Sequence, residues 1–276
     1  MLKSSKVFLK KTKNIKPDVA VILGSGLTNF FEKKNIIKLI SYRELPNFPE
    51  PTVKGHLGKV VLGKIKSHNI LCLHGRSHIY EGINTNSLKT PIRFLKDIGC
   101  KLIIITNAAG SIHKSIKPGS IMSIKDHINW SGFNPLIGPN EDDYGPRFSD
   151  MSDPYDKFYR KQLKKIAKKI NQKIYEGTYC MFSGPSFETP AEIKAMRTLG
   201  VSAVGMSTVP EVIIANHCSL PVVALSVITN QAAGISKNKL SHKETLEQAA
   251  LVEKKILKLI KNFIKELIFY DTTRNN

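Results

Sequence analysis

Two short segments carry side chains that could bind an anion. Gly24-Ser25-Gly26 follows the apolar run 19–23, and a glycine-rich turn with a serine can surround an anion with amide and hydroxyl donors. A tight strand-to-helix turn is an equally good interpretation, because the sequence lacks the full dinucleotide and P-loop patterns. Arg76 follows a second apolar run, and its planar guanidinium suits phosphate oxygens. His78 and Tyr80 would face one side of an extended chain there.

A metal site is not expected from the histidines or the cysteines. His74 and His78 have the spacing of a metal-binding pair on a helix, but Gly75 and Gly82 argue against a helix in this segment. The four cysteines lie too far apart for a metal knuckle or a redox pair. We expect them to be buried free thiols in a reducing cytoplasm.

Four further segments could lie at a ligand site. Phe187 lies beside Glu188 in a turn rich in glycine and proline, and an aromatic face next to one acceptor can hold a flat heterocycle. A structural role for the Glu188 carboxylate is the alternative, since a helix start follows it. Segments 205–211 and 228–234 begin at the ends of apolar runs, where α/β sheets usually bind ligands. Segment 106–111 could be approached by a ligand too, although alone it is typical of a plain strand end.

These segments are positioned by alternating strand and helix patterns. The predicted buried strands are 19–23, 70–73, 102–106, 121–124, 203–206 and 222–229. Capping boxes beginning at Thr189 and Ser241 predict two helix starts, and Gly200 predicts the end of the first helix. The second helix is long and carries apolar residues on one face. The pattern indicates an α/β fold in a single domain, residues 1–276, with helices on both sides of the sheet. The irregular stretch 129–154 is long enough to suggest a functional loop.

The charge balance allows two interpretations. Lys and Arg number 42 against 22 Asp and Glu, a net charge of +20, which could serve a nucleic-acid partner. The lysines are dispersed, however, and two dense runs, 161–173 and 254–265, read as solvated helix faces. We favour a general compositional bias, with a basic field that attracts small anions. Residues 1–16 are expected to form a loosely ordered basic N-terminus. Its apolar run, residues 7–9, is too short for the core of a signal peptide. No apolar run approaches a membrane span.

Taken in order, the segments resemble the trimeric purine nucleoside phosphorylases, which share a fold with methylthioadenosine phosphorylases. The resemblance covers the chain from about Val19 to the C-terminal helix. It is carried by VILGSGL, GHLG, HGRSHIYEG, TNAAGSI, SGPSFETPAEI, GMSTVPE and ITNQAAGIS. It implies a purine/uridine phosphorylase-like fold with a central mixed β-sheet flanked by helices.

The resemblance also implies a role for each of thirteen residues. Phosphate would be bound by Ser25, His56, Arg76, His78, the backbone of Ala108, and Ser207. Ribose would contact Tyr80 and Met206, with its 5′-hydroxyl at His242. The purine would be held by Phe187, Glu188 and Asn230. Phe148 would be lent to the neighbouring subunit of a homotrimer.

The implied reaction is phosphorolysis of a purine nucleoside. Cleavage of the N-glycosidic bond builds positive charge on the ribose, and phosphate stabilises this cation before attacking it. Catalytic roles would fall to Asn230, Glu188, His78 and His242. Asn230 would donate to N7 or O6, and Glu188 would accept from N1–H. Inorganic phosphate is the co-substrate, and neither metal nor cofactor is required.

We expect 6-oxopurine nucleosides such as inosine and guanosine as substrates. Adenine-preferring relatives carry Asp where this chain has Asn230, and matched buried polar groups discriminate strongly. After Asn230 the chain reads Gln231-Ala232-Ala233-Gly234, closer to the bacterial-type than to the mammalian members.

Four alternatives stay open at this point. Two belong to the same family, a methylthioadenosine and a xanthosine phosphorylase. A calcium-dependent nucleoside hydrolase would need an N-terminal aspartate cluster, whereas only Asp18 lies near the first strand. A nucleic-acid-binding protein with a degenerate pocket would bind DNA or RNA in a strongly salt-dependent way.

Overall fold

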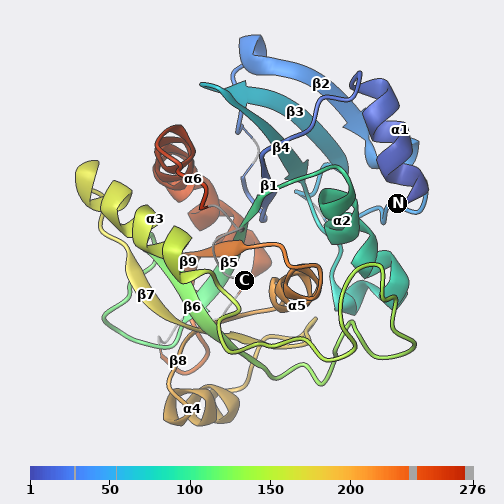
Figure 1. Ribbon diagram of the computed structural model, residues 1–276. Coiled ribbons are helices and arrows are strands. Elements are labelled where there is room, and N and C mark those ends of the chain that lie inside the picture. The colour runs from blue at the N-terminus through green and yellow to red at the C-terminus, as the bar shows by residue number, and fades with distance from the viewer. Residues whose placement is uncertain (28, 54, 236–240, 271–276) are drawn as a thin grey trace.

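The strands of the protein form one twisted mixed sheet (Figure 1). The computed structural model describes residues 1–27, 29–53, 55–235 and 241–270, without the side chains of His242 and Lys243. The strands are β1 (Val19–Leu23), β2 (Ile36–Ser41), β3 (Lys59–Ile65), β4 (His68–His74), β5 (Leu102–Ser111), β6 (Ile121–Asn129), β7 (Tyr175–Met181), β8 (Val201–Gly205) and β9 (Val222–Gln231). Their order is β2-β3-β4-β1-β5-β8-β7-β6-β9.

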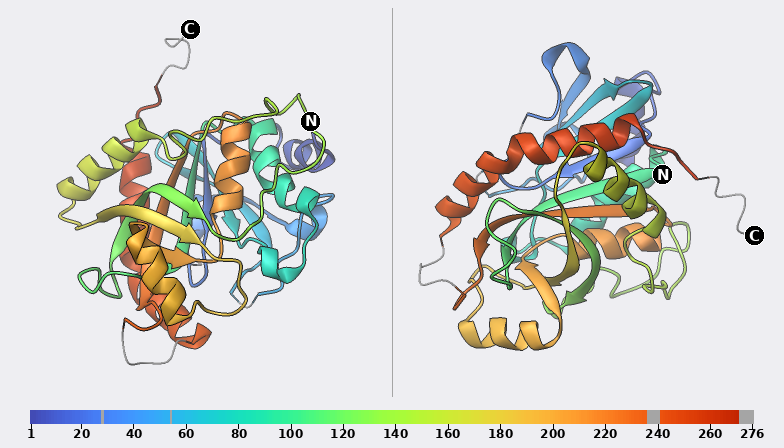
Figure 2. Two further views of the ribbon diagram at one scale, coloured as in Figure 1. Left: turned by 90° about the horizontal axis from the view of Figure 1, so that it is seen from below. Right: turned by 90° about the vertical axis from the view of Figure 1, so that its left-hand side faces the viewer.

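Helices cover both faces of this sheet. They are α1 (Lys3–Lys11), α2 (Thr85–Asp97), α3 (Lys157–Lys169), α4 (Pro190–Thr198), α5 (Val209–His217) and α6 (His242–Lys265), with short 3-10 turns η1 (Lys33–Asn35), η2 (Tyr42–Glu44) and η3 (Ile79–Glu81). One face packs against α1, α2 and α5, and the other against α3 and α6 (Figures 1 and 2). The alternation of side chains along each strand divides the core in this way: Ala20 and Ile22 point to the first face, while Val21 points to the second.

Strand β5 is the centre of the sheet. It pairs in parallel with β1 on one side and with β9 on the other, and its last residues pair with β8. The β5–β9 pairing closes a ring through β8, β7 and β6. Because β1, β5 and β9 run parallel, their carboxyl ends open at one edge of the sheet, which is where the predicted site segments begin.

The predicted fold class is confirmed, with strand content underestimated. All six predicted strands are present, and Thr189 and Ser241 cap α4 and α6 as expected. Strands β2, β3 and β7 were missed. β7 carries Glu176, Gly177 and Thr178 and so lacks the apolar run of a buried strand. β2 and β3 do contain short apolar runs, interrupted by Lys38 and Gly63, and these runs were overlooked. The stretch 130–156 contains neither helix nor strand, as predicted.

The prediction of a loosely ordered N-terminus is wrong. Residues 3–11 form α1, in which Phe8 is fully buried. The Phe8 ring packs edge-on against Phe94 of α2, with centroids 5.3 Å apart. The Ser5 hydroxyl donates to Asp97 at 2.8 Å. The buried ring of Phe8 therefore packs this short basic helix against the protein. The basic composition of the segment had suggested that it would be solvated.

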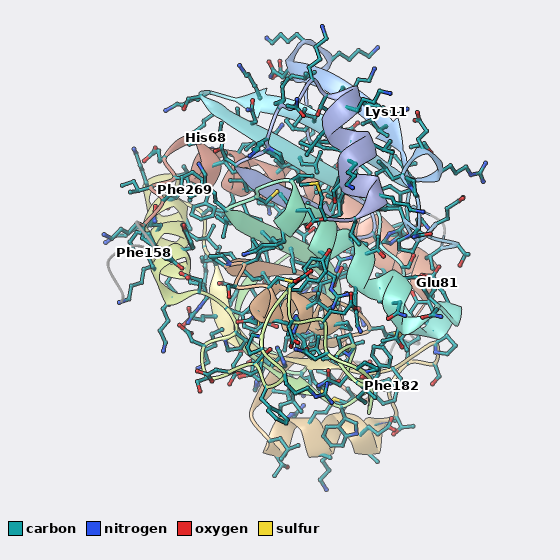
Figure 3. All side chains as sticks on the ribbon, turned by 45° about the vertical axis from the view of Figure 1, so that its right-hand side comes forward. Lys11, His68, Glu81, Phe158, Phe182 and Phe269 are labelled. Carbon is teal, nitrogen blue, oxygen red and sulfur yellow. The ribbon has the colours of Figure 1, made fainter. Side chains whose placement is uncertain are left out.

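Aromatic side chains fix the segment that follows α6. The Phe269 ring lies 5.7 Å from that of His68 and also packs on Tyr159 of α3. Figure 3 shows His68, Phe269 and Phe158 following one another along this side. The Tyr270 hydroxyl donates to Asp156 at 2.8 Å. None of the helices described is long and apolar enough to cross a membrane.

Candidate active site

A cavity of about 310 Å³ opens at the carboxyl ends of the central strands. Most of the predicted site residues line it: Ser25, His56, Arg76, His78, Tyr80, Ala108, Phe187, Glu188, Met206, Ser207 and Asn230. They come from segments up to about two hundred residues apart, which only the strand order brings together. Phe148 is 88% exposed in the long loop and does not line the cavity. The side chain of His242 lies outside the described part of the chain, but Thr245, one turn further along α6, does line the cavity.

The hydrogen bonds of His56 fix the direction of the Ser25 hydroxyl. The backbone N–H of Arg76 donates to His56 Nδ1 at 2.8 Å, so this nitrogen carries no proton. A neutral imidazole then has its proton on Nε2, which lies 3.0 Å from Ser25 Oγ. Because Ser25 accepts this bond, its own hydrogen remains for a group in the cavity. Such a hydroxyl is suited to an anion.

Gly24 is required by the close approach of β5. A Cβ at this position would lie 2.8 Å from the Thr106 carbonyl oxygen and 2.9 Å from Asn107 Cα, both far inside van der Waals contact. The Gly24 N–H is not available to an anion, because it donates to Thr106 Oγ1 at 2.9 Å. The glycine-rich turn therefore contributes the Ser25 side chain and close packing, with its first amide used internally.

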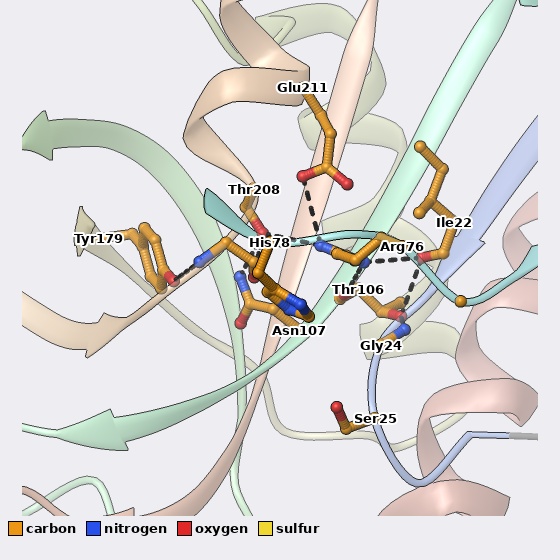
Figure 4. Close-up of polar contacts among 12 residues, drawn as sticks. Ile22, Gly24, Ser25, Arg76, His78, Thr106, Asn107, Tyr179, Thr208 and Glu211 are labelled. Carbon is orange, nitrogen blue, oxygen red and sulfur yellow. Dashed lines mark hydrogen bonds and ion pairs between the residues drawn. The ribbon is translucent and has the colours of Figure 1, made fainter. Parts of the chain in front are cut away.

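The guanidinium of Arg76 is held by protein acceptors. Nη1 donates to Thr208 Oγ1 at 3.3 Å and to Glu211 Oε2 at 3.4 Å. Nη2 donates to the Ile22 carbonyl at 3.4 Å and to that of Thr106. Figure 4 shows Glu211 and Ser25 on opposite sides of Arg76. The sequence predicted a guanidinium fork open to the ligand; the structure instead uses both Nη groups internally. What remains for a ligand is the positive charge, because the Nε–H is buried, although it has no partner among the described residues.

His78 is oriented by Glu81. The Glu81 carboxylate accepts from His78 N at 2.6 Å and lies 3.0 Å from His78 Nδ1. Burial alone would raise the pKa of Glu81, but hydrogen bonds from His78 and Thr52 lower it to about 2. An ionised Glu81 keeps the proton on His78 Nδ1 and leaves Nε2 for a ligand. The expected extended chain is wrong, since η3 begins at Ile79, yet the His78 and Tyr80 rings stack at 4.8 Å.

A second group of residues that line the cavity suits a heterocycle. Glu188 is only 6% exposed, and burial raises the pKa of its carboxyl above the ordinary value. The Thr229 hydroxyl donates to Asn230 Oδ1 at 2.9 Å, which sets the orientation of the amide. Asn230 Nδ2 donates to the Gln231 carbonyl at 3.3 Å and has a second hydrogen for a ligand. Phe187, 39% exposed, offers an aromatic face nearby.

Comparison with known proteins agrees with this geometry. The family model of the phosphorylase superfamily matches residues 18–265. The chain belongs to the purine nucleoside phosphorylases. It is 45% identical to purine nucleoside phosphorylase 1 of Bacillus subtilis over 94% of this chain and 96% of that one. It is 43% identical to the Bos taurus purine nucleoside phosphorylase, covering 87% and 86%. The Schistosoma mansoni purine nucleoside phosphorylase in complex with inosine superimposes with a TM-score of 0.88 at 33% identity, covering 98% and 97%.

Several residues that contact the site of this phosphorylase were not among the residues predicted from the sequence. Glu81 and Glu211 stand inside the motifs HGRSHIYEG and GMSTVPE. The histidines and the arginine of the first motif were the available signal for Glu81, whereas the second motif contains neither residue type. Thr229 also stands inside a motif. Tyr179, whose hydroxyl accepts from the Ser207 N–H at 3.4 Å, and Thr245 carry no sequence signal, because only the tertiary structure brings them to the site.

His74 makes the stability of the phosphorylase depend on pH. The residue is 6% exposed, and its ring nitrogens have no partner among the described residues. Burial, and secondly the charge of Lys59, lower its pKa to about 4. Since the unfolded chain takes up this proton near pH 6.5 and the folded chain only near pH 4, stability falls as pH falls through this window, by about 3 kcal/mol. We expect His74→Gln, which stays neutral, to lose about that much less stability between pH 7 and pH 4 in denaturant titrations. Parallel curves for both proteins would contradict this account.

Proposed function

We propose that this phosphorylase cleaves 6-oxopurine ribonucleosides and 2′-deoxyribonucleosides, inosine and guanosine among them, with inorganic phosphate. The products are the free base and the pentose 1-phosphate. The observation that carries the proposal is a single cavity lined by two groups of residues. Hydroxyl donors and a cation, Ser25, Ser207 and Arg76, form what we call the anion end, and Glu188 and Asn230 form what we call the base end. A hydrolase uses water as the attacking group and would not need an anion-binding group of residues.

The anion end supports phosphate as the attacking group. Ser25 donates its free hydrogen, and Arg76 supplies positive charge. In the neutral imidazole with its proton on Nδ1, His78 Nε2 can accept from a phosphate hydroxyl. Ser207 and the Ala108 backbone line the same region, and His56 acts through Ser25. Preorganised donors of this kind stabilise charge without rearranging during the reaction. We therefore assign phosphate to this group of residues.

The middle of the cavity supports binding of the pentose. Tyr80 stacks on His78, and Met206 lies close to Tyr80 across Gly184, where an added Cβ would touch both side chains. We assign the ribose to Tyr80 and Met206. His242, at the start of α6, is the candidate for the 5′-hydroxyl; its neighbour Thr245 faces the cavity, which supports placing the start of α6 beside the sugar.

The base end supports a preference for 6-oxopurines. A 6-oxopurine has a hydrogen at N1, which the Glu188 carboxylate can accept, whereas adenine presents a lone pair there. The second Asn230 Nδ2 hydrogen can reach N7 or O6. Phe187 provides a stacking face. Burial of Glu188 and Asn230 makes a mismatched base costly, because a buried polar group without its partner loses hydration with no compensating bond.

In the reaction we propose, the C1′–N9 bond breaks and its electron pair goes to the base. Positive charge develops on the sugar, and the bound phosphate stabilises it. A phosphate oxygen then forms the bond to C1′, while Asn230 stabilises the purine anion until it gains a proton. Holding phosphate and nucleoside in one cavity supplies the proximity that this step needs.

The test is base release from inosine, guanosine, xanthosine, adenosine and methylthioadenosine, each with and without phosphate. We expect release from inosine and guanosine only when phosphate is present. Equal release without phosphate would indicate a hydrolase. Comparable rates with adenosine or methylthioadenosine would overturn the proposed preference, and salt-sensitive binding of DNA or RNA without any cleavage would favour the nucleic-acid alternative.

We further propose that Phe148 completes the site of a neighbouring subunit in a homotrimer. Its ring is 88% exposed on the long loop, an exposure that a partner surface would remove. We expect Phe148→Ala to raise the KM for inosine about tenfold and to leave the KM for phosphate nearly unchanged.

Mixed oligomers give the sharper form of this test. Phe148→Ala subunits keep an intact site but lend no ring, while Asn230→Ala subunits lend a ring but have a defective site. Co-expressed and assayed at inosine concentrations below the native KM, the two should show more activity than either variant alone. A monomeric protein, or no gain on mixing, would exclude the shared site.

A further inference from the structure

The backbone at Thr208 adopts a conformation that a threonine avoids. Its φ is 77° and its ψ is −48°, and the Val209 N–H donates to the Ser207 carbonyl at 2.9 Å. A three-residue turn closed in this way with positive φ at its centre is a rare, strained γ-turn. Glycine would adopt it without strain, whereas a β-branched side chain does not. Strain of this kind persists where surrounding contacts enforce it, and such places cluster at functional sites.

The contacts that enforce it involve the Thr208 hydroxyl. Thr208 is fully buried. Its Oγ1 receives hydrogen bonds from Asn107 Nδ2 at 2.8 Å and from Arg76 Nη1 at 3.3 Å, and it lies 3.2 Å from Ser207 Oγ. Amide and guanidinium nitrogens only donate, so they occupy both acceptor positions of the hydroxyl. The Thr208 hydrogen is therefore left to donate to Ser207 Oγ.

This arrangement sets the direction of a second hydroxyl in the anion end. Because Ser207 accepts from Thr208, its own hydrogen can be donated into the cavity that Ser207 lines. His56 does the same for Ser25 on the other side. Both serines are thus turned into donors by a neighbour, which is what an anion requires and what a cation would not.

A role in the helix does not account for this hydroxyl. Thr208 is the N-cap residue of α5, but its side chain makes no capping hydrogen bond. The helix uses its backbone carbonyl instead, which accepts from Val212 N at 3.0 Å. A threonine is therefore not needed to begin α5, and a glycine would fit the turn better.

We infer that Thr208 is a positioning residue of the phosphate site: its strained turn places one hydroxyl where it orients Arg76 and makes Ser207 a hydrogen donor toward phosphate. It does not line the cavity itself and acts through these two residues. The inference rests on the proposed function.

The test compares Thr208→Val with Thr208→Ser. Valine keeps the shape and the strain but removes the hydroxyl, whereas serine keeps the hydroxyl. We expect Thr208→Val to raise the KM for phosphate about tenfold while the KM for inosine changes less than twofold, and Thr208→Ser to stay within about threefold of the native values. A purely structural role would lower stability without separating the two KM values.

A second variant protects the test against misfolding. Thr208→Gly relieves the strain at positive φ and lacks the hydroxyl, so it should fold and still show weak phosphate binding. Binding is read as the rise in Tm on adding inorganic phosphate without nucleoside, which needs no catalysis. If the valine and glycine variants respond to phosphate as the native protein does, the inference is wrong. If the native protein shows no phosphate-dependent cleavage, it is the proposed function that fails.

Discussion

Asn230→Asp should lower kcat/KM for inosine by about a hundredfold to a thousandfold and raise that for adenosine about tenfold. The substitution replaces the Nδ2 donor with a carboxylate, which repels the O6 and N7 lone pairs of hypoxanthine but can accept from the adenine amino group. The gain with adenosine is smaller because Glu188 still faces N1. Only the protonated form of Glu188 can donate to N1 of adenine. Burial raises the pKa of Glu188 and thereby favours this form, which supports binding of adenosine.

Steady-state kinetics with both nucleosides at saturating phosphate measure this change. Asn262→Asp on α6, where the amide donates to Lys258 O at 2.8 Å far from the cavity, introduces the same charge and should leave the selectivity unaltered. If Asn230→Asp keeps the native ratio of inosine to adenosine, Asn230 does not select the base. A Thr229→Val variant, which removes the bond that orients the amide, should lower the inosine rate less and without favouring adenosine.

Arg76→Met should reduce kcat/KM for phosphate by about a hundredfold to a thousandfold. The substitution removes the positive charge at the anion end and also the links to Thr208, Glu211 and the carbonyls of Ile22 and Thr106. Arg76→Lys keeps the charge but cannot satisfy four acceptors at once. It should therefore recover only part of the loss, with the KM for inosine close to native in both variants.

Initial rates as a function of phosphate concentration test this expectation. Arg76→Met leaves Glu211 without its cation, so the double variant with Glu211→Gln separates loss of phosphate binding from loss of stability. Arg43→Met, whose side chain is 79% exposed, is the matched surface control. Native phosphate dependence in Arg76→Met would remove Arg76 from the site.

Much of the fold and most of the site follow from local sequence. β-Branched apolar runs are sufficient to predict β1, β4, β5, β6, β8 and β9, because a buried strand needs an uninterrupted apolar segment. The capping patterns at Thr189 and Ser241 predict helix starts, because the cap satisfies the first free amides of a helix locally. The motifs at the strand ends predict most of the residues that line the cavity, because parallel strands bring their carboxyl ends together.

The rest depends on contacts between distant parts of the chain. The helix at residues 3–11 is stabilised because Phe8 packs against Phe94. No local sequence pattern predicts this contact. The direction of each hydroxyl at the anion end is set by residues far away: His56 for Ser25, and Asn107 and Arg76, through Thr208, for Ser207. Sequence alone determined which chemical groups this protein brings to its site. Tertiary structure decided which of them donate, which accept, and that the Arg76 guanidinium turns toward the protein, because a hydrogen bond depends on the geometry of both partners.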